Sequence, residues 1–414
     1  MSTNEWAAKA HQLDRYRWRL LRERHGVFGS ALRFIRDALN DWRFGVRAKR
    51  HLIESVVAEP CDFLLLQSKP EVIKLRRKKL LIEGLRNRGH KLVETALSTR
   101  ENILRERLLK RPPHPVPTRY LGFAAHAEWL VERYRPRILL NDRNGSLYAP
   151  FLRLALNTRQ HLLAHLAHAT TLESSPRLSM NDYDYYFLFG QSSLDALQAR
   201  ALRFGASTVL LAGSHMIDRS FDLPQADPAL RTLLVLGVGP DKEKESGYQN
   251  TYALLRDWTA RHPDWRVLIK AHPRSQTPFW QQAADALGNV CLLPRECGLA
   301  QALEQASVVV NIMSNAVLEA ALARRPILYV NAGEDADIFA QERFLGRRIS
   351  CMDELISGMN EMGNSYADCV ERSARFARYH LAQGYNGLDH CLELLEQLLT
   401  GSSPNGIALP ASPQ

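Results

Sequence analysis

Three His-Pro dipeptides occur in the 414-residue chain, and only the one at His272 directly follows an expected buried strand, residues 265–270. Lys270, His272 and Arg274 therefore lie at the carboxyl end of that strand, and Pro273 turns the chain toward the next helix. Clustered cationic side chains of this kind bind phosphate or pyrophosphate. We expect a phosphate site here; the alternative is a structural turn with incidental basic residues.

A second polar segment follows another expected strand, residues 307–311. Asn311 ends this strand, and Ser314 and Asn315 are residue types that often cap the start of a helix. A helix that begins there presents free backbone N–H groups, a hydroxyl and a dipole to an anion. Glu319, one turn further on, could accept hydrogen bonds from ribose hydroxyls or from a base. An ordinary helix cap with Glu319 on the surface is the alternative.

A third loop contains Gly237 and Gly239 and ends the expected strand at residues 232–237. Glycines allow the backbone to approach a ligand closely. A Gly-x-Gly pair alone is a weak signal, because the third glycine of a dinucleotide-binding fingerprint is missing. We interpret this segment as a flexible loop that faces the ligand.

The first half of the chain offers candidate acid–base residues. Asp142 ends the expected strand at residues 137–142 and could act as a general base toward an acceptor hydroxyl, although a loop or cap role fits its position equally well. His161, His165 and His168 are close in sequence, but alternation along a strand divides them between two faces, and no closing ligand is evident. We therefore expect no metal site, and we interpret His168 as lining the ligand cleft.

Alternating strand and helix signals position these residues. Short Val-, Leu- and Ile-rich runs alternate with helical stretches in both halves of the chain, which is typical of parallel, doubly wound sheets. Residues 213–231 are loop-like and separate the halves. We predict an α/β, GT-B-like fold, in which two doubly wound domains face a cleft and bind ligands at the carboxyl ends of their strands.

The predicted domain boundaries follow from these signals. We expect a basic helical extension over residues 1–59, a Rossmann-like domain over 60–220, a second over 221–400 whose last helices cross back, and a disordered tail over 401–414. Within the first domain we expect a basic helix over 71–88.

Positive charge is concentrated at the N-terminal end. Residues 1–112 contain 26 Lys/Arg and 13 Asp/Glu, whereas the remaining residues contain 28 and 31. This asymmetry suggests an anionic partner: membrane lipid, a lipid-linked glycan or nucleic acid. Arginines and aromatic residues interleave in residues 1–59, which suits an interfacial helix, a helix docked on its own core, or a solvated helical face.

Targeting and redox signals are weak. No apolar run reaches the roughly 18 residues that span a bilayer, and the N-terminus has no secretory signal. The six cysteines form no C-x-x-C pair. These features favour a reducing cytoplasm.

Two motifs together resemble a known group of enzymes. The segments Lys-Ala-His-Pro at 270–273 and Ser-Asn-Ala-Val-Leu-Glu-Ala at 314–320 resemble the HP and Ser/Thr motifs of bacterial surface-glycan transferases. This group includes polysialyltransferases, lipooligosaccharide sialyltransferases and the Kdo transferases of capsule and lipopolysaccharide. The resemblance covers about residues 230–330, and a single Ser314 stands where the relatives often carry two or three.

The resemblance implies that His272 and Ser314 bind the phosphates of a CMP-sugar, and that His272 protonates the leaving phosphate. The predicted protein is a metal-independent, cofactor-free glycosyltransferase that moves Kdo or a sialic acid onto a lipopolysaccharide or capsule acceptor. The basic extension would hold it at the cytoplasmic face of an anionic membrane. The predicted catalytic residues are Asp142, His168 and His272, and the predicted nucleotide-binding residues are Gly237, Gly239, Lys270, His272, Arg274, Asn311, Ser314, Asn315 and Glu319.

Other functions stay open at this point. A CDP-glycerol-type polyol-phosphate transferase would use the same phosphate site, as would a non-catalytic protein that binds anionic ligands. A nucleic-acid-binding protein with a basic arm is disfavoured by the acidic balance after residue 112 and by the lack of a nucleic-acid-binding motif. A sugar-nucleotide epimerase of the same fold would need acid and base groups at the sugar, which the sequence does not locate.

Overall fold

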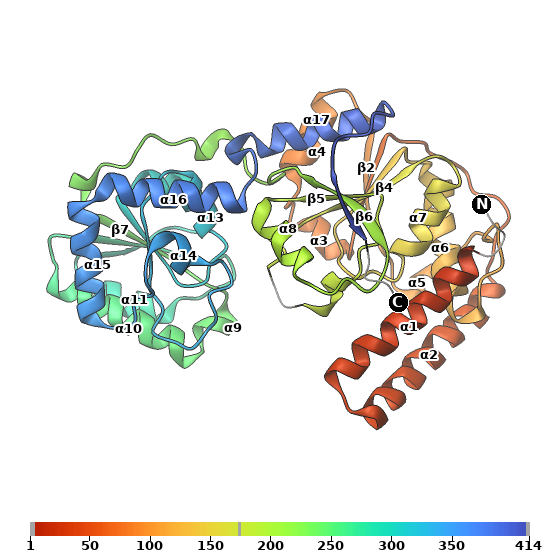
Figure 1. Ribbon diagram of the computed structural model, residues 1–414, viewed down its shortest axis with the longest axis horizontal. Helices are drawn as coiled ribbons and strands as arrows, with labels where there is room; N and C mark the ends of the chain where they lie inside the picture. Colours follow the sequence, from red (N-terminus) through yellow and green to blue (C-terminus); the bar gives the residue numbers. More distant parts are fainter. Residues whose placement is uncertain (1–4, 173–174, 411–414) are drawn as a thin grey trace. The chain divides into compact units, whose positions relative to one another are not determined.

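The computed structural model describes residues 5–172 and 175–410, and the chain divides into two compact units (Figure 1). Unit 1 comprises residues 1–216 and 388–414, and unit 2 comprises residues 217–387. The chain therefore leaves unit 1 once and returns to it. The boundary falls in the loop-like stretch where a domain boundary is expected.

Unit 1 is built on a seven-stranded sheet with the order β12-β6-β5-β4-β3-β1-β2. Its strands are largely buried and rich in Leu, because a parallel sheet in a doubly wound fold is covered on both faces. Every neighbouring pair is parallel except β12 with β6. The strands are β1 (Phe63–Gln67), β2 (Leu92–Ala96), β3 (Ile138–Asn141), β4 (Leu162–Leu166), β5 (Tyr185–Leu188), β6 (Ala206–Leu211) and β12 (Ile407–Pro410).

Helices cover this sheet. Leucines of α4 and α17 join those of the strands in one core, and a Cβ added at Gly84 of α4 would lie 2.7 Å from Leu392 of α17. The helices are α3 (Pro70–Lys74), α4 (Lys79–Asn87), α5 (Arg100–Arg105), α6 (Thr118–Tyr134), α7 (Ala149–Asn157), α8 (Gln191–Gln198) and α17 (Gly387–Leu399), with a 3-10 turn, η1 (Pro176–Ser179).

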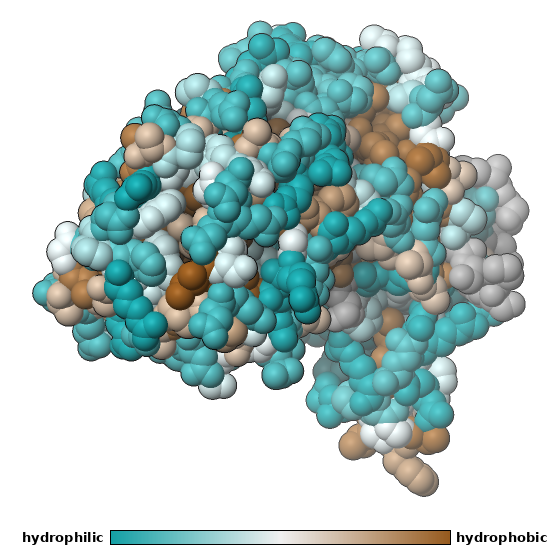
Figure 2. Space-filling model, turned by 60° about the vertical axis from the view of Figure 1, so that its left-hand side comes forward, coloured by the Kyte–Doolittle hydropathy of each residue, from teal (hydrophilic) through white to brown (hydrophobic). Residues whose placement is uncertain are grey.

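The N-terminal extension is a helical hairpin of α1 (Glu5–Arg24) and α2 (Val27–Lys49), as the sequence predicts. One side of α2 packs on α6. The buried Asp41 carboxylate accepts hydrogen bonds from Arg17 of α1 and Arg100 of α5, at 2.5 Å each, and so ties three helices together. Figure 2 shows hydrophobic and hydrophilic residues side by side at the end of the hairpin, at the bottom of the view.

Unit 2 has a five-stranded parallel sheet with the order β11-β10-β7-β8-β9. β7 lies at its centre, and the chain builds first toward β9 and then, on the other side of β7, toward β11. The strands are β7 (Thr232–Leu236), β8 (Arg266–Lys270), β9 (Val290–Leu292), β10 (Val308–Asn311) and β11 (Ile327–Tyr329).

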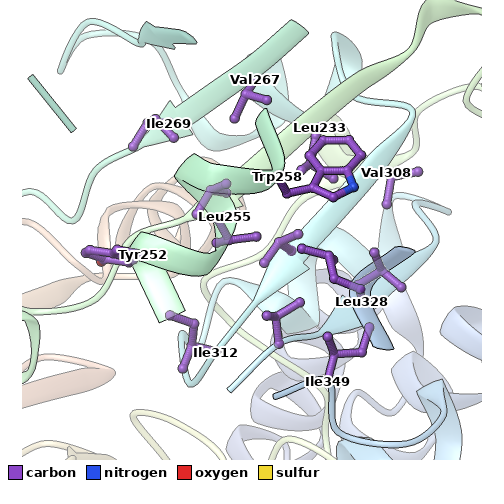
Figure 3. Close-up of a cluster of buried hydrophobic side chains, with 14 of the residues drawn as sticks. Leu233, Tyr252, Leu255, Trp258, Val267, Ile269, Val308, Ile312, Leu328 and Ile349 are labelled. Atoms are coloured by element: carbon purple, nitrogen blue, oxygen red, sulfur yellow. The ribbon is translucent and has the colours of Figure 1, made fainter. Parts of the chain in front are cut away.

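Helix α10 contributes large side chains to the core of unit 2. Tyr252, Leu255 and Trp258 are buried against the strands, with Leu233 and Val267 among their neighbours (Figure 3). The helices are α9 (Pro240–Glu243), α10 (Ser246–Arg261), α11 (Pro278–Ala286), α12 (Leu299–Glu304), α13 (Val317–Leu322), α14 (Gln341–Leu345), α15 (Met352–Asn364) and α16 (Tyr366–His380), with 3-10 turns η2 (Arg219–Phe221), η3 (Pro228–Leu230) and η4 (Gly384–Asn386).

Two expectations need correction. The predicted helix over 71–88 is interrupted between α3 and α4, where Arg76 adopts a left-handed backbone with φ of 50°. The predicted disordered tail contains β12, which pairs antiparallel with β6 and covers that edge of the sheet. Residues 411–414 of the tail, and residues 1–4 of the extension, lie outside the described residues.

Candidate functional site

Three of the predicted segments meet at one edge of the sheet of unit 2. The loops after β7, β8 and β10 all leave from the carboxyl ends of parallel strands, and β7 is hydrogen-bonded to both β8 and β10. The direction of strand addition reverses between β7 and β10. In doubly wound sheets this switch point is where ligands bind. The topology therefore places the Gly237 loop between the His272 loop and the Ser314 loop.

The first two loops are in direct backbone contact. The Gly237 N–H donates to the Lys270 carbonyl at 2.9 Å, and a Cβ added at Gly237 would lie 2.9 Å from the His272 backbone nitrogen. Any side chain at 237 would therefore push the loops apart. Gly239 lies beside the second loop, since a Cβ built on it would be 3.5 Å from the guanidinium of Arg274.

The His272 ring is oriented by its own loop. Its Nδ1 accepts a hydrogen bond from the Arg274 backbone N–H at 3.2 Å, which leaves Nε2 as the protonated nitrogen of the neutral ring. His272 is partly buried and Arg274 is exposed. The Lys270 ammonium donates to the Cys297 carbonyl and so ties this edge to the loop that follows β9, a contact that the sequence did not indicate; its role as a ligand cation stays a prediction.

The loop after β10 is held by buried amides. Asn311 is fully buried; its Oδ1 accepts from the Ser314 N–H at 3.0 Å, and its Nδ2 donates to Gln341 at 2.7 Å. Asn311 thus holds the loop in place through two side-chain hydrogen bonds. The Ser314 hydroxyl accepts a long hydrogen bond from the Ala316 N–H, at 3.4 Å, and Asn315 is exposed.

Helix α13 begins later than expected, at Val317 rather than at Ser314 or Asn315. Residues 314–316 form a turn before it, so the predicted capping role of Ser314 is not seen. Within α13, Oε2 of Glu319 is buried and has no hydrogen-bond partner among the described residues. Burial raises the pKa of the Glu319 carboxyl to about 7.

A cavity of about 320 Å³ adjoins Arg274, with Lys244, Tyr252, Phe279 and Gln276 among its other lining residues. Two cations and two aromatic rings are suited to a small anionic or planar group. A larger hollow of about 490 Å³ lies between α13 and α16, and none of the predicted site residues lines it.

In unit 1, Asp142 directly follows β3 and forms a buried ion pair with Lys78, which precedes α4. His168 lies just beyond β4 and is exposed. The geometry thus gives Asp142 a strong structural partner that the sequence did not indicate. Lys78 lies within a run of basic residues, so nothing in the sequence distinguishes it.

Two buried histidines lie near this pair. Burial lowers the pKa of His165 well below its usual value and that of His215 to about 3, and the positive charge of Lys78 adds to both effects. Both rings are therefore neutral. His165 Nε2 contacts Asn144 at 2.8 Å, whereas His165 Nδ1 and His215 Nε2 have no partner among the described residues.

No group of three or more His, Cys, Asp or Glu side chains within residues 5–172 and 175–410 is arranged to hold a metal ion. Within the same residues no helix is long and apolar enough to cross a membrane.

No protein-family model and no curated protein matches the chain. Solved structures do. A putative UDP-N-acetylglucosamine 2-epimerase from Listeria monocytogenes has a TM-score of 0.53 and 13% identity, covering 85% of this chain and 100% of its own. A UDP co-structure of S. aureus MnaA has a TM-score of 0.51 and 11% identity, covering 83% and 99%. A glycotransferase of kitacinnamycin has a TM-score of 0.51 and 16% identity, covering 82% and 100%.

These structures have the fold that the sequence predicts, and the chain has a GT-B-like α/β fold. The prediction of a transferase that uses CMP-activated Kdo or sialic acid is wrong, because several similarly folded structures are named as UDP-N-acetylglucosamine 2-epimerases and another holds UDP. The capsule and lipopolysaccharide acceptors predicted with it, the CDP-glycerol alternative and the non-catalytic alternative have no support either.

Proposed function

We propose that this protein is an enzyme of nucleotide sugars that binds a UDP-sugar through the loops of unit 2 described above. The observation that carries the proposal is the pairing of β7 with both β8 and β10, which gathers the loops of Gly237, His272 and Ser314 at the switch point of the sheet. The names of similarly folded structures supply the nucleotide, UDP.

Each loop has a role in the proposal. His272 donates from Nε2 to a phosphate oxygen, and Arg274 supplies the neighbouring positive charge. The Ser314 hydroxyl oxygen accepts from the Ala316 N–H, which leaves its O–H to donate to the same diphosphate. Glu319 accepts from the ribose hydroxyls, which would give its buried oxygen the partner that it lacks. Gly237 has no side chain, which lets the diphosphate approach the backbone closely.

Within this class we favour an epimerase of the UDP-sugar, which the names of several similar structures support. Inversion at a carbon removes a proton from one face and returns one to the other, so substrate and product are isomers and no acceptor is consumed. Such a step needs acid and base groups. The catalytic roles expected for Asp142 and His168 stay predictions from the sequence.

Calorimetric titration of the full-length protein tests the nucleotide site. We expect UDP to bind, and CMP to bind at least about tenfold more weakly. His272→Ala and Ser314→Ala should each weaken UDP binding by roughly 10- to 100-fold, the effect of losing one hydrogen bond to a charged group. His114→Ala removes the histidine of another His-Pro dipeptide and is the matched control. Equal UDP affinity in the His272 and His114 variants would overturn the proposed site.

The reaction class needs a separate readout. Incubation with UDP-N-acetylglucosamine, followed by NMR of the sugar ring, should reveal the 2-epimer. Release of free UDP without any epimer would overturn the epimerase assignment while leaving the UDP site intact.

A further inference from the structure

The outer side of α2 carries a continuous row of exposed apolar side chains. The row is called here the α2 stripe, and its members are exposed to between 43% and 92%. They recur at intervals of four and three residues, so they lie on one face of the helix. The α2 stripe consists of Phe28, Leu32, Ile35, Leu39 and Trp42.

The exposure of the α2 stripe is set by firm packing on the opposite side. Phe44 and Ala48 of α2 are buried where the helix packs on α6, and Asp41 is buried in its ion pairs with Arg17 and Arg100. A rotation of α2 that buried the stripe would bring this carboxylate into water and break the ion pairs. The stripe is thus not a core face, and its side chains stay exposed against the described residues of unit 1.

Arginines surround the α2 stripe. On α2 itself Arg36 and Arg43, four residues after Leu32 and Leu39, are exposed beside it, and Arg15 and Arg19 are exposed on the adjoining α1. Of the acids on the hairpin, Asp14, Asp37 and Asp41 are paired with arginines of unit 1, and Glu23 is paired with Arg203. The hairpin therefore offers an apolar row bordered by positive charge.

We propose that the α2 stripe docks on an anionic lipid surface. A helix that lies in a membrane interface buries a row of Phe, Trp, Leu and Ile side chains among the acyl chains and keeps its basic residues at the anionic headgroups, which is the arrangement seen on α2. The proposal concerns unit 1 alone and does not depend on the UDP site of unit 2.

The surrounding charge disfavours other occupants. A second copy of the chain joined through the stripe would bring Arg36 and Arg43 of one hairpin toward those of the other, and like charges across an interface weaken it. A nucleic acid would engage the arginines but would leave Leu32, Ile35 and Leu39 in water. Only a partner that is both anionic and apolar satisfies both features.

Flotation of the full-length protein with lipid vesicles tests the proposal. We expect binding to vesicles of phosphatidylcholine with phosphatidylserine, weaker binding to phosphatidylcholine alone, and a loss of binding as salt rises. The triple variant Phe28→Gln, Leu32→Gln, Ile35→Gln should bind at least tenfold more weakly. Because these residues are exposed and Gln is a good helix former, the variant should fold normally, which circular dichroism and UDP binding would check.

A matched control changes three apolar residues that lie elsewhere in the chain and are comparably exposed. The variant Val57→Gln, Leu75→Gln, Leu230→Gln alters side chains exposed to between 51% and 81%, and we expect it to bind vesicles like the wild type. Equal binding by the two triple variants would overturn the proposal. Failure of the wild type to bind phosphatidylserine vesicles, or a dimer in sedimentation that only the stripe variant dissociates, would also overturn it.

The charged border is tested in the same assay. Arg36→Gln and Arg43→Gln together should weaken binding roughly 25-fold, at about fivefold for each cation near the surface. Two exposed arginines of unit 2 serve as the control, namely Arg261 and Arg347. An equal loss in both arginine variants would mean that net charge alone drives association, and would contradict a specific role for the hairpin.

Discussion

Glu319 carries a carboxyl group that burial has made unusually easy to protonate. Its pKa of about 7 in the folded protein lies above the ordinary value of 4.5. Between these values the folded state holds more protons than the unfolded state, so stability falls as pH rises through this window and the full cost is present above pH 7. Glu319→Gln removes the ionisable group.

The expected result is a variant that is more stable than the wild type above pH 7, by at most about 3 kcal/mol, with a difference that shrinks toward pH 4.5. Urea unfolding at both ends of this range measures it. A stability difference that does not change with pH would contradict the burial of Glu319. The same ionisation predicts that UDP affinity increases as pH rises through about 7 in the wild type and not in Glu319→Gln.

Gly237 was expected to let a ligand approach the backbone, and the structure shows that it also lets the loop after β8 approach. Gly237→Ala places a Cβ 2.9 Å from the His272 backbone nitrogen, so the β7 and β8 loops must separate. We expect a loss of about 1–3 kcal/mol of stability, and UDP binding weakened at least tenfold. Gly288→Ala, which meets no atom within 4 Å, should change neither quantity. Melting and titration of the two variants would contradict the site if Gly237→Ala bound UDP normally.

The ion pair of Asp142 with Lys78 allows a structural role of Asp142 to be distinguished from a catalytic role. Asp142→Asn leaves the buried Lys78 ammonium without its partner, which we expect to cost about 3–5 kcal/mol. The double variant Lys78→Met, Asp142→Leu should recover most of that stability, since apolar side chains replace both charges. If Asp142 is a catalytic group, the double variant stays inactive although it folds; recovered activity would assign the residue to packing alone.

The position of Gly237, His272 and Ser314 at one edge of the sheet could be predicted, because each lies just after a buried strand and the ends of parallel strands meet there; their binding roles stay predictions. The contacts of Lys270 with Cys297 and of Asn311 with Gln341 could not be predicted, since the two residues of each pair are about thirty residues apart in the chain. Side-chain roles that depend on such distant contacts are set by packing rather than by local pattern.

At the scale of elements, hydrophobic periodicity located the strands of both sheets except β12, but not every helix boundary. The expected start of α13 at Ser314 rested on capping propensity, whereas the structure uses Asn311 to hold Ser314 in a turn and begins the helix at Val317. The break between α3 and α4 has no Gly or Pro, so a left-handed Arg76 could not be expected. Tertiary contacts determined both the start of α13 and the break between α3 and α4.

The tail strand β12 is likewise held by tertiary contacts, and this can be tested directly. Leu409 is buried and its carbonyl accepts from Asn181, whereas Ile407 is exposed. Leu409→Ala should cost about 2 kcal/mol, and Ile407→Ala less than about 1 kcal/mol. Urea denaturation of the two variants provides the comparison. Equal effects would mean that the last strand contributes little to unit 1.

At the scale of the whole molecule, the fold was predictable and the ligand was not. The alternation of strand and helix signals along the sequence predicted two doubly wound units, because this order of elements favours a parallel sheet covered by helices. The motifs at 270–273 and 314–320 indicate a phosphate site but carry no information on the base. CMP and UDP both carry a phosphate on the ribose that these residues could contact, so the prediction of CMP rested on resemblance alone and the structural comparison overturned it.

The most direct test of the central claim is a crystal structure of the full-length protein grown with UDP. We expect nucleotide density at the carboxyl ends of β7, β8 and β10, with a phosphate oxygen within hydrogen-bond distance of both His272 Nε2 and the Ser314 hydroxyl, and with the ribose at Glu319. UDP bound at any other place, or the loops of His272 and Ser314 left empty at a saturating UDP concentration, would contradict it.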